Sequence, residues 1–232
     1  MKITGLRTVL AALGAKNCVF VLIETDEGIT GLGETVLKRR SKMIEAGIHP
    51  GDMVLVPDLS TGAIDPFWEV LTLSFICSTL EADTHSIFPN DPRNIALRAE
   101  AYLRETGIAD QSHWGPEFEF YVFDSVAFEN EINRASYRLD SFEADWNSAA
   151  CGHGHYIPLH GGYHAIPPKD QLYNLRAEIS LHLEALGVEV KYHHHEVGGP
   201  GQCEIETPLV GLLAAGDMTL WVKYVSKMTA HS

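Results

Sequence analysis

The stretch Gly115-Pro116-Glu117-Phe118-Glu119-Phe120-Tyr121-Val122-Phe123 alternates acidic and apolar residues. This alternation predicts a β-strand, because successive side chains of a strand point to opposite faces of its sheet. Glu117 and Glu119 then share one face, and the aromatic residues between them face a core. An acidic pair on one face is also typical of a solvated surface, so the strand alone does not define a site.

A second stretch repeats the acidic pattern. In His193-His194-His195-Glu196-Val197, a strand places His194 and Glu196 on one face. A glycine-rich turn at 198–201 follows, and Gln202-Cys203-Glu204-Ile205-Glu206 places Glu204 and Glu206 on a common face. If the three strands are neighbours, up to five carboxylates enter one space. Like charges at that distance require a counter-charge, and an oxygen-rich cluster suits Mg²⁺ or Mn²⁺.

Other interpretations of these residues remain open at this point. The triple histidine suggests a zinc site, although no cysteine or second histidine pair lies at zinc spacing. Paired carboxylates also occur in glycosidases, but three or four acids around one centre exceed what that chemistry requires. For most of the acidic residues a solvated surface is the simplest explanation.

The remaining chain predicts the α+β class, because strands and helices mix without strict alternation. Asp91, Pro92 and Gly107 have the pattern of a helix cap, first helical residue and stop. Asp170 is the expected cap of a second helix, which Gly187 ends. The 125–165 segment shows no sustained period and is expected to be mostly loop. The other expected elements are strands at 2–11, 17–25, 29–36, 52–57, 71–79, 188–197 and 204–207, and a helix at 212–229.

Composition limits the class of partner. The chain has 232 residues and a net charge of −14, which argues against duplex nucleic acid as a ligand. Residues 1–46 carry a balance of +2 and residues 47–232 one of −16. No apolar run reaches the ~20 residues of a membrane span, and no signal-peptide core is present, so we expect a cytoplasmic protein. The four separated cysteines are expected to be reduced thiols.

Several of these motifs resemble one enzyme family. The Gly-Pro-Glu-x-Glu-Phe strand at 115–120 and the His-His-His-Glu-Val…Gly-Gln-x-Glu segment at 193–204 are similar to those of type I glutamine synthetases. The step from Glu196 to Glu204 is the same in both. Further similar stretches follow in the family's order: 52–61, 91–93, 106–110 and 162–168.

The resemblance implies an ATP-dependent ligase of nitrogen metabolism that joins ammonia to glutamate through γ-glutamyl phosphate, with Mg²⁺ or Mn²⁺ as cofactor. Glu119, Glu196 and Glu204 would hold the first divalent ion, and Glu117 would contribute to the second. His194 would lie by the nucleotide phosphates. Lys191 stands at a nucleotide-contacting position where the family often has an acid. Glutamate, ammonia and ATP would be the substrates, and a homo-oligomer is expected for the family.

The chain also departs from this family. Ser41 to Ala46 replace the family's Asp-Gly-Ser-Ser turn, whose Asp helps to deprotonate ammonium. The resemblance covers about residues 47–230, and the family's second-metal His and Glu, glutamate-binding loop and phosphate-binding arginines have no counterpart among the 232 residues. We therefore expect impaired activity from this chain alone. The alternative is a divalent-ion-binding remnant without catalysis.

The first 36 residues have a different resemblance. Met1 to Arg7 and Val19 to Glu34 are similar to the N-terminal cap of the mandelate racemase branch of the enolase superfamily. This predicts a small antiparallel sheet and leaves an enolase-superfamily lyase or isomerase fragment as a further alternative, although no βα repeat supplies the barrel of that family. The expected organisation is a cap-like segment with its junction at 1–46, the remainder of a β-grasp N-terminal domain at 47–112, and the first part of a catalytic domain at 113–232.

Overall fold

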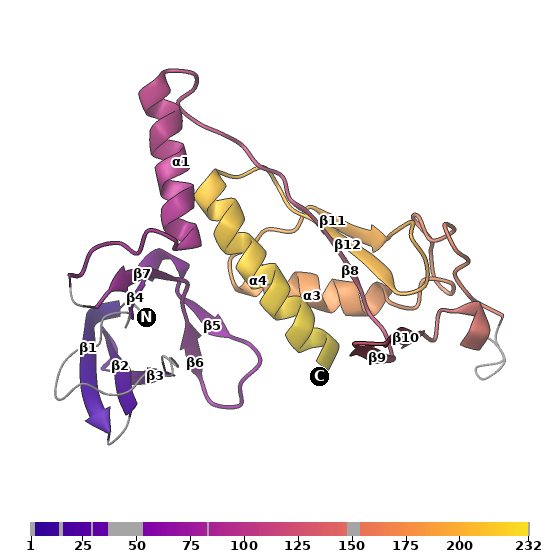
Figure 1. Ribbon diagram of the computed structural model, residues 1–232, viewed down its shortest axis with the longest axis horizontal. Helices are drawn as coiled ribbons and strands as arrows, with labels where there is room; N and C mark the ends of the chain where they lie inside the picture. Colours follow the sequence, from indigo (N-terminus) through magenta and orange to yellow (C-terminus); the bar gives the residue numbers. More distant parts are fainter. Residues whose placement is uncertain are drawn as a thin grey trace. The chain divides into compact units, whose positions relative to one another are not determined.

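The computed structural model describes residues 3–13, 16–28, 30–36, 53–82, 84–147 and 154–231 (Figure 1). The chain divides into two compact units, Met1–Ala99 and Glu100–Ser232, which are described separately here. Both units combine helices with small antiparallel sheets, and the predicted α+β class is confirmed. The domain boundaries expected near residues 46 and 112 stay predictions. No helix in the described segments has both the length and the apolar character needed to cross a membrane.

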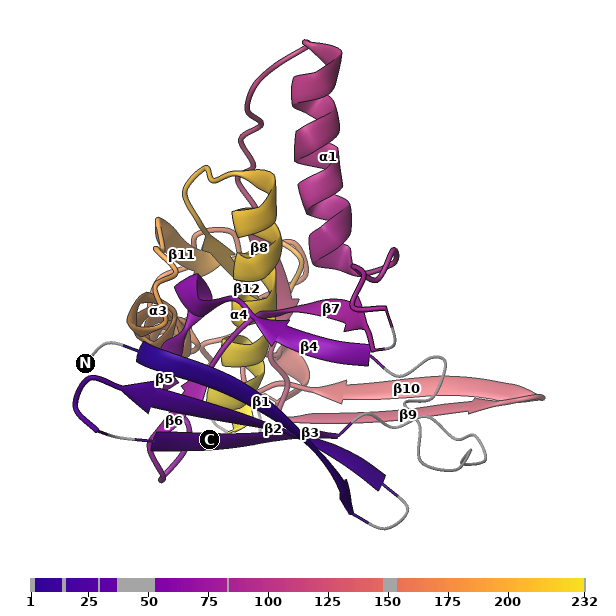
Figure 2. The ribbon, with the colours of Figure 1, turned by 90° about the vertical axis from the view of Figure 1, so that its left-hand side faces the viewer.

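The first unit opens with a three-stranded antiparallel sheet, which confirms the sheet predicted for the N-terminal residues. Its strand order is β1-β2-β3, and Figure 2 shows the twist of the three strands. A turn at 26–28 joins the last two strands: Gly28 has a φ of 74°, a left-handed conformation that glycine adopts at no steric cost, and its N–H donates to the Thr25 carbonyl at 3.1 Å. The strands are β1 (Ile3–Leu13), β2 (Lys16–Thr25) and β3 (Thr30–Val36).

Two short strand pairs complete the sheets of this unit. The strand expected at 71–79 is divided in two, because the backbone N–H of Ile76 donates to the Thr61 hydroxyl at 2.9 Å and its carbonyl accepts from the Asp58 N–H at 2.9 Å. Ile76 is therefore bonded to the turn at Asp58 and Thr61, between two separate strand pairs. The pairs are β4 (Met53–Pro57) with β7 (Cys77–Glu81), and β5 (Ala63–Asp65) with β6 (Thr72–Ser74), and η1 (Leu59–Thr61) lies between them in the chain.

Helix α1 (Pro92–Thr106) has the predicted bounds. The Asp91 carbonyl accepts from the Ile95 N–H at 3.0 Å, and Gly107 ends the helix with a φ of 69°. The side chain of Asp91 also accepts from the Thr79 backbone N–H at 3.3 Å, which links the start of the helix to β7. The sequence pattern was sufficient here, because capping signals act over only a few residues.

The second unit is built on a three-stranded antiparallel sheet with the order β11-β12-β8 (Figure 1). Helix α3 packs against β11 and β12 and also against helix α4. Apolar side chains from the two helices and from β12 are buried, so the core of this unit lies on one face of the sheet. The elements are β8 (Glu117–Tyr121), β11 (Tyr192–His195), β12 (Gln202–Glu206), α3 (Tyr173–Ala185) and α4 (Leu212–His231).

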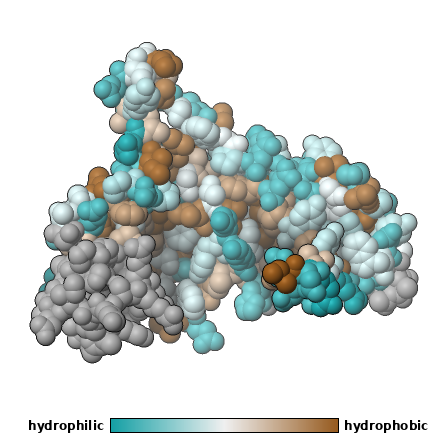
Figure 3. All heavy atoms as spheres, viewed as in Figure 1, coloured by the Kyte–Doolittle hydropathy of each residue, from teal (hydrophilic) through white to brown (hydrophobic). Residues whose placement is uncertain are grey.

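The segment expected to be mostly loop contains a β-hairpin, so that prediction was wrong for residues 125–140. The strands β9 (Ser125–Glu131) and β10 (Arg134–Asp140) pair through a two-residue turn. Phe128 and Tyr137 lie opposite each other and are 81% and 79% exposed. Residues 134–140 alternate polar and apolar side chains, which places Ala135, Tyr137 and Leu139 on one face. The second strand therefore carries the pattern of a half-buried strand, although both faces of the hairpin are largely exposed. The part of the surface where the hairpin lies is largely hydrophilic (Figure 3).

Two smaller expectations also differ from the structure. The strand predicted at 188–197 is assigned only at Tyr192–His195, although its ladder continues at both ends through the N–H groups of Lys191 and Glu196. Asp170 does not occupy the cap position of α3, which belongs to Leu172. The Asp170 carboxylate instead pairs with the buried guanidinium of Arg176 at 2.6 Å, a contact that depends on the folded helix.

Candidate metal centre

The acidic residues predicted from strand alternation lie in register across the sheet. His194 on β11 is opposite Glu204 on β12, and Glu204 is opposite Glu119 on β8. Glu206 is in the same way opposite Glu117. Because directly opposed residues project from the same face, the three strands present one row of His, Glu and Glu and a second row with two further acids.

Three of these side chains form a close group. His194, Glu196 and Glu204 each offer one ligand atom, and the three atoms lie within 4.8 Å of one another. Nε2 of His194 lies 3.3 Å from Oε2 of Glu204. Glu196 and Glu204 are both buried, and His194 is half-buried. Such a group, with one imidazole nitrogen and two carboxylates, can supply part of the coordination shell of a divalent cation.

The orientation of His194 is set by its own strand. Nδ1 lies 3.0 Å from the backbone carbonyl oxygen of His195, which can only accept, so Nδ1–H is the donor. In the neutral ring Nε2 then carries the lone pair, and this is the atom that faces Glu204. A histidine held through one nitrogen by a carbonyl, with the other nitrogen free, is the usual arrangement of a metal-ligating histidine.

Glu119 and Glu117 lie next to this group but outside it. Glu119 accepts a hydrogen bond from Nε2 of Gln202 at 2.8 Å, and both acids are exposed. Their charges still act on the centre. Burial raises the pKa of Glu204 above its usual value, Glu196, Glu119 and Glu117 raise it further, and His194 opposes them. The centre thus holds more negative charge than its own residues balance, and this surplus favours a bound cation.

Glu206, the fifth acid on this face, has a partner that the sequence analysis did not foresee. Its carboxylate pairs with Nζ of Lys191, and the Lys191 backbone N–H donates to the Glu206 carbonyl at 2.8 Å. The lysine also lies over the Tyr192 ring, 5.1 Å from its centroid. Lys191 therefore neutralises one carboxylate at the edge of the sheet. The register places Tyr192 and not Lys191 opposite Glu206, so strand alternation did not indicate this pairing.

The zinc interpretation of the triple histidine does not agree with the geometry. Only His194 points toward the acids, because strand alternation places His193 and His195 on the opposite face. His193 contacts Arg176 at 3.4 Å and the Tyr173 ring, and burial lowers its pKa, with a further lowering by Arg176. The three consecutive histidines therefore cannot chelate one ion together.

The donor set fits a hard divalent cation. Carboxylate oxygens dominate it, as Mg²⁺ and Mn²⁺ prefer, and the single imidazole is compatible with Mn²⁺. The buried Glu204 carboxylate, whose pKa is raised, gains most from a cation, because its ionisation is otherwise opposed by burial and by like charge. The residues present therefore fit the metal that the sequence analysis expected.

Comparison with known proteins decides the family. The family described as "Glutamine synthetase, catalytic domain" matches residues 89–232, which include every residue of the candidate centre. The chain belongs to the glutamine synthetase family. A glutamine synthetase of Streptomyces coelicolor is 46% identical over 185 residues, and that of Escherichia coli K12 is 42% identical over 189 residues. These alignments cover 79% and 80% of this chain. They cover 39% and 40% of the two relatives, so the chain spans less than half of their length.

Family membership leaves room for more than one reaction. A relative from Cupriavidus pinatubonensis, 41% identical over 190 residues, covering 80% of this chain and 40% of that protein, is named 3-hydroxylaminophenol mutase. The fold is shared more widely. A glutamine synthetase structure from Plasmodium falciparum superposes with a TM-score of 0.68 at 20% identity, over 90% of this chain and 44% of that one. At this identity the likeness establishes the fold and not the activity.

Two predictions from the sequence concern residues at or beyond the limit of these comparisons. The family match begins at residue 89, and the matches do not support the enolase-superfamily resemblance of the first 36 residues. The replaced Asp-Gly-Ser-Ser turn at 41–46 lies outside the described residues, as do Asp52, Cys151 and the side chain of Cys18. Cys77 and Cys203 are free thiols, as expected, and burial raises the pKa of Cys203 to about 11.

The loop at 162–168, noted in the sequence only for its family resemblance, contacts the candidate centre. The ring of His164 stacks on His194 with centroids 4.2 Å apart, and Tyr163 meets His194 edge-on. His164 has a φ of 51°, a left-handed conformation rare for residues other than glycine, and its N–H donates to the His195 carbonyl at 3.1 Å. Long-range ring contacts of this kind leave no periodic signal in the sequence.

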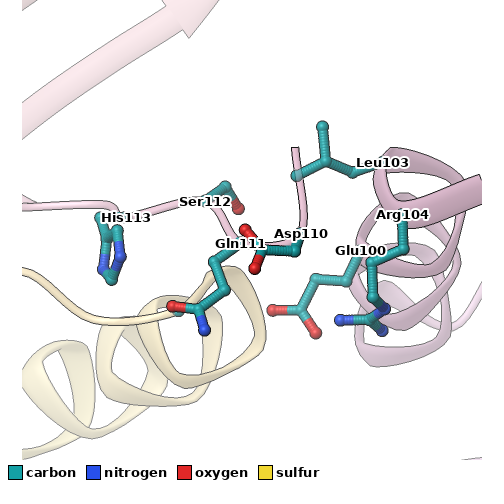
Figure 4. A pocket seen from close by; sticks show the side chains of 8 residues that line it. Glu100, Leu103, Arg104, Asp110, Gln111, Ser112 and His113 are labelled. Carbon is teal, nitrogen blue, oxygen red and sulfur yellow. The ribbon is translucent and has the colours of Figure 1, made fainter. Parts of the chain in front are cut away.

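A separate cavity of about 160 Å³ lies in the second unit, between the end of α1, the following loop and the start of α4 (Figure 4). Glu100 and Arg104 come from the helix, and Asp110, Gln111 and His113 come from the loop. Glu100 accepts a hydrogen bond from the Leu213 N–H at 3.4 Å, so its carboxylate is bonded to the first turn of α4. The cavity shares no residue with the acidic cluster, and most of its lining side chains are exposed, so the candidate centre remains at the sheet.

Proposed function

We propose that this chain functions in an ATP-dependent ligase of the glutamine synthetase type. In that reaction the γ-phosphoryl group of ATP passes to the side-chain carboxylate of glutamate, and ammonia then displaces phosphate to leave glutamine, ADP and phosphate. The observation that carries the proposal is the buried group of His194, Glu196 and Glu204 within a chain of this family. Small-molecule substrates and a homo-oligomeric assembly are part of the proposal.

The residues of the sheet have distinct proposed roles. Glu196 and Glu204 would hold the first divalent cation together with Glu119, which is opposite Glu204 and accepts a hydrogen bond from Gln202. His194 would contribute Nε2 to the same centre and lie by the nucleotide phosphates, and Glu117 would contribute to a second ion. The bound cation would supply positive charge to neutralise the transferring phosphoryl group.

Lys191 is proposed to contact the nucleotide. Its ammonium group is half-exposed and paired with Glu206 at the edge of the acidic face, where a phosphate could compete for it. Lysine binds phosphate as a compact point charge, and an exchange of one anion for another requires no rearrangement of the sheet. The pair with Glu206 would hold the lysine in place until the nucleotide arrives.

Cation binding is the first test, because it requires only the described residues. Titration of the purified chain with Mn²⁺ in a calorimeter should show a binding event that Glu196→Ala removes or weakens at least ~10-fold, as expected for loss of a ligand. Glu184→Ala on α3 is the matched control: it removes the same charge from an exposed position. Equal binding by wild type and Glu196→Ala would contradict the proposed centre.

The reaction is tested by formation of γ-glutamyl hydroxamate from glutamate, hydroxylamine and ATP with Mg²⁺ or Mn²⁺. Turnover that Glu196→Ala abolishes would support the ligase. Mn²⁺ binding without turnover would favour a cation-binding protein without this catalysis, and isomerisation of a hydroxylaminophenol would instead favour the activity for which the Cupriavidus relative is named.

A further inference from the structure

Directly beneath the candidate centre lies a buried acid–histidine pair that takes no part in the proposed reaction. Nε2 of His195 lies 3.0 Å from Oε2 of Glu143, and both side chains are fully buried. Glu143 comes from the segment before η2 (Asp145–Asn147), far in sequence from β11. A buried pair of this kind is retained only where its hydrogen bonds are well satisfied.

Both carboxylate oxygens of Glu143 and both ring nitrogens of His195 have hydrogen-bond partners. The Glu143 carboxylate accepts from the Gln171 N–H at 2.7 Å and from the Gly201 N–H at 2.9 Å, in addition to His195. Nδ1 of His195 lies 2.8 Å from the backbone oxygen of Glu196. Since a carboxylate and a carbonyl both accept, both ring nitrogens of His195 donate. The pair thus binds the backbone at Glu196 and at Gly201, the two ends of the turn that joins β11 to β12.

The position of His195 connects this pair to the cation ligands. His195 stands between His194 and Glu196, and its side chain points away from the acidic face while theirs point toward it. Its backbone carbonyl accepts from Nδ1 of His194 at 3.0 Å and from the His164 N–H at 3.1 Å. The ring and backbone of one residue therefore hold the orientation of both neighbouring ligands.

We propose that Glu143 and His195 are positioning residues that set the geometry of the cation site. His195 fixes the Glu196 backbone and the His194 ring, and Glu143 fixes His195 and the turn at Gly201 that leads to Glu204. The inference rests on the proposed cation centre and deepens it, since it assigns residues outside the ligand set that determine affinity and coordination. Partners that orient metal ligands commonly change metal affinity by about 10–100-fold when removed.

The test uses the full chain with Glu143→Gln, which keeps the shape of the side chain but removes its charge and sets an NH₂ group against at least one of the three donors to Glu143. Mn²⁺ affinity in the calorimeter should fall about 10–100-fold. The electron paramagnetic resonance spectrum of bound Mn²⁺ should also change, because the ligands are no longer held in one arrangement. Glu143→Asp keeps the charge and should fall between wild type and Glu143→Gln.

The variant Leu183→Ala separates a loss of stability from a loss of the positioning hydrogen bonds. Leu183 is fully buried in α3, and its side chain makes none of these hydrogen bonds. This variant should melt at a lower temperature yet bind Mn²⁺ with unchanged affinity and spectrum. If Glu143→Gln behaves in the same way, the pair is merely structural and the inference is overturned.

A variant at Gly162 disturbs the hydrogen bond between the His195 ring and the Glu196 carbonyl without changing either residue. A Cβ at Gly162 would lie 2.4 Å from Nδ1 of His195 and 2.5 Å from the Glu196 carbonyl oxygen. Gly162→Ala should therefore displace this bond and weaken Mn²⁺ binding even though every acid remains. If wild type does not bind Mn²⁺, the proposed function fails; if wild type binds, Glu196→Ala does not, and both Glu143→Gln and Gly162→Ala bind normally, only the positioning inference fails.

Discussion

Nε2 of His194 lies 3.3 Å from Oε2 of Glu204, across the register of two adjacent strands. With Nδ1–H of the same ring bonded to a backbone carbonyl, this contact is either an ion pair of a protonated histidine or the opening of a cation site. The other acids around Glu204 favour the second role, because one imidazolium cannot balance three further carboxylates. The contact also makes the centre sensitive to pH.

The stability gained from Mn²⁺ should decrease on acidification. The pKa of Glu204 is raised by burial and by Glu196, Glu119 and Glu117, so without cation the folded protein holds this proton more tightly than the unfolded chain does. The contribution of Glu204 to stability is therefore greatest at low pH and falls as pH rises through its folded pKa. A cation requires the ionised form and reverses this trend. Mn²⁺ at about 100 times Kd should add about 2.7 kcal/mol near neutral pH, and much less once the pH falls below the folded pKa of Glu204.

Melting curves with and without Mn²⁺ at several pH values measure this effect. Glu204→Gln should remove most of the Mn²⁺-dependent shift and also flatten the pH dependence of the metal-free protein. Glu184→Gln, at an exposed position on α3, should change neither. A Mn²⁺-dependent shift that stays constant throughout acidification, or one that survives in Glu204→Gln, would contradict this role of Glu204.

The buried pair of Arg176 and Asp170 should be the most sensitive polar contact of the second unit. Two hydrogen bonds of 3.0 and 2.6 Å join these side chains, which are 0% and 1% exposed. Asp170→Asn leaves a buried guanidinium without its counter-charge, and we expect a loss of about 3–5 kcal/mol in the free energy of unfolding. Urea unfolding of the full chain gives this quantity.

A double-mutant cycle checks the cause of that loss. Arg176→Met combined with Asp170→Asn removes both charges and keeps an acceptor for the Leu172 N–H, which bonds to Asp170 at 3.2 Å. The double variant should recover part of the loss, so that the two single effects are far from additive. Additive losses would show that the ion pair itself is not the source of the effect.

Lys191 should contribute to nucleotide affinity if it exchanges Glu206 for a phosphate. Lys191→Met removes the charge but keeps most of the aliphatic stem, and a lost charge-assisted contact should weaken MgATP binding roughly 10-fold. Glu206→Gln frees the lysine and should leave MgATP affinity equal or higher. Isothermal titration with a non-hydrolysable ATP analogue measures both variants. Unchanged MgATP affinity in Lys191→Met would show that this lysine does not contact the nucleotide and that its role is limited to the ion pair with Glu206.

Local sequence patterns predicted the elements whose signals lie within a few residues. The helix α1 has the expected bounds because its cap, its proline and its terminal glycine are adjacent to the turns that they control. The strand alternation also predicted that Glu117, Glu119, His194, Glu196 and Glu204 belong to a common face, since a period of two is a property of the backbone. The hairpin β9–β10 was missed although residues 134–140 alternate polar and apolar side chains, because the partner strand follows this pattern only at Val126 and Phe128.

By itself, then, the sequence determined which side chains face the same way, and the motif spacing that indicated the family. Only the tertiary structure decided which of them meet. His194, Glu196 and Glu204 converge, Glu119 bonds to Gln202, and Glu206 forms an ion pair with Lys191. The buried partner of His195 was likewise unforeseen, because Glu143 reaches it from another segment of the chain. The reason is physical: alternation acts along one strand, whereas strand register and buried hydrogen bonds are set by contacts between residues far apart in sequence.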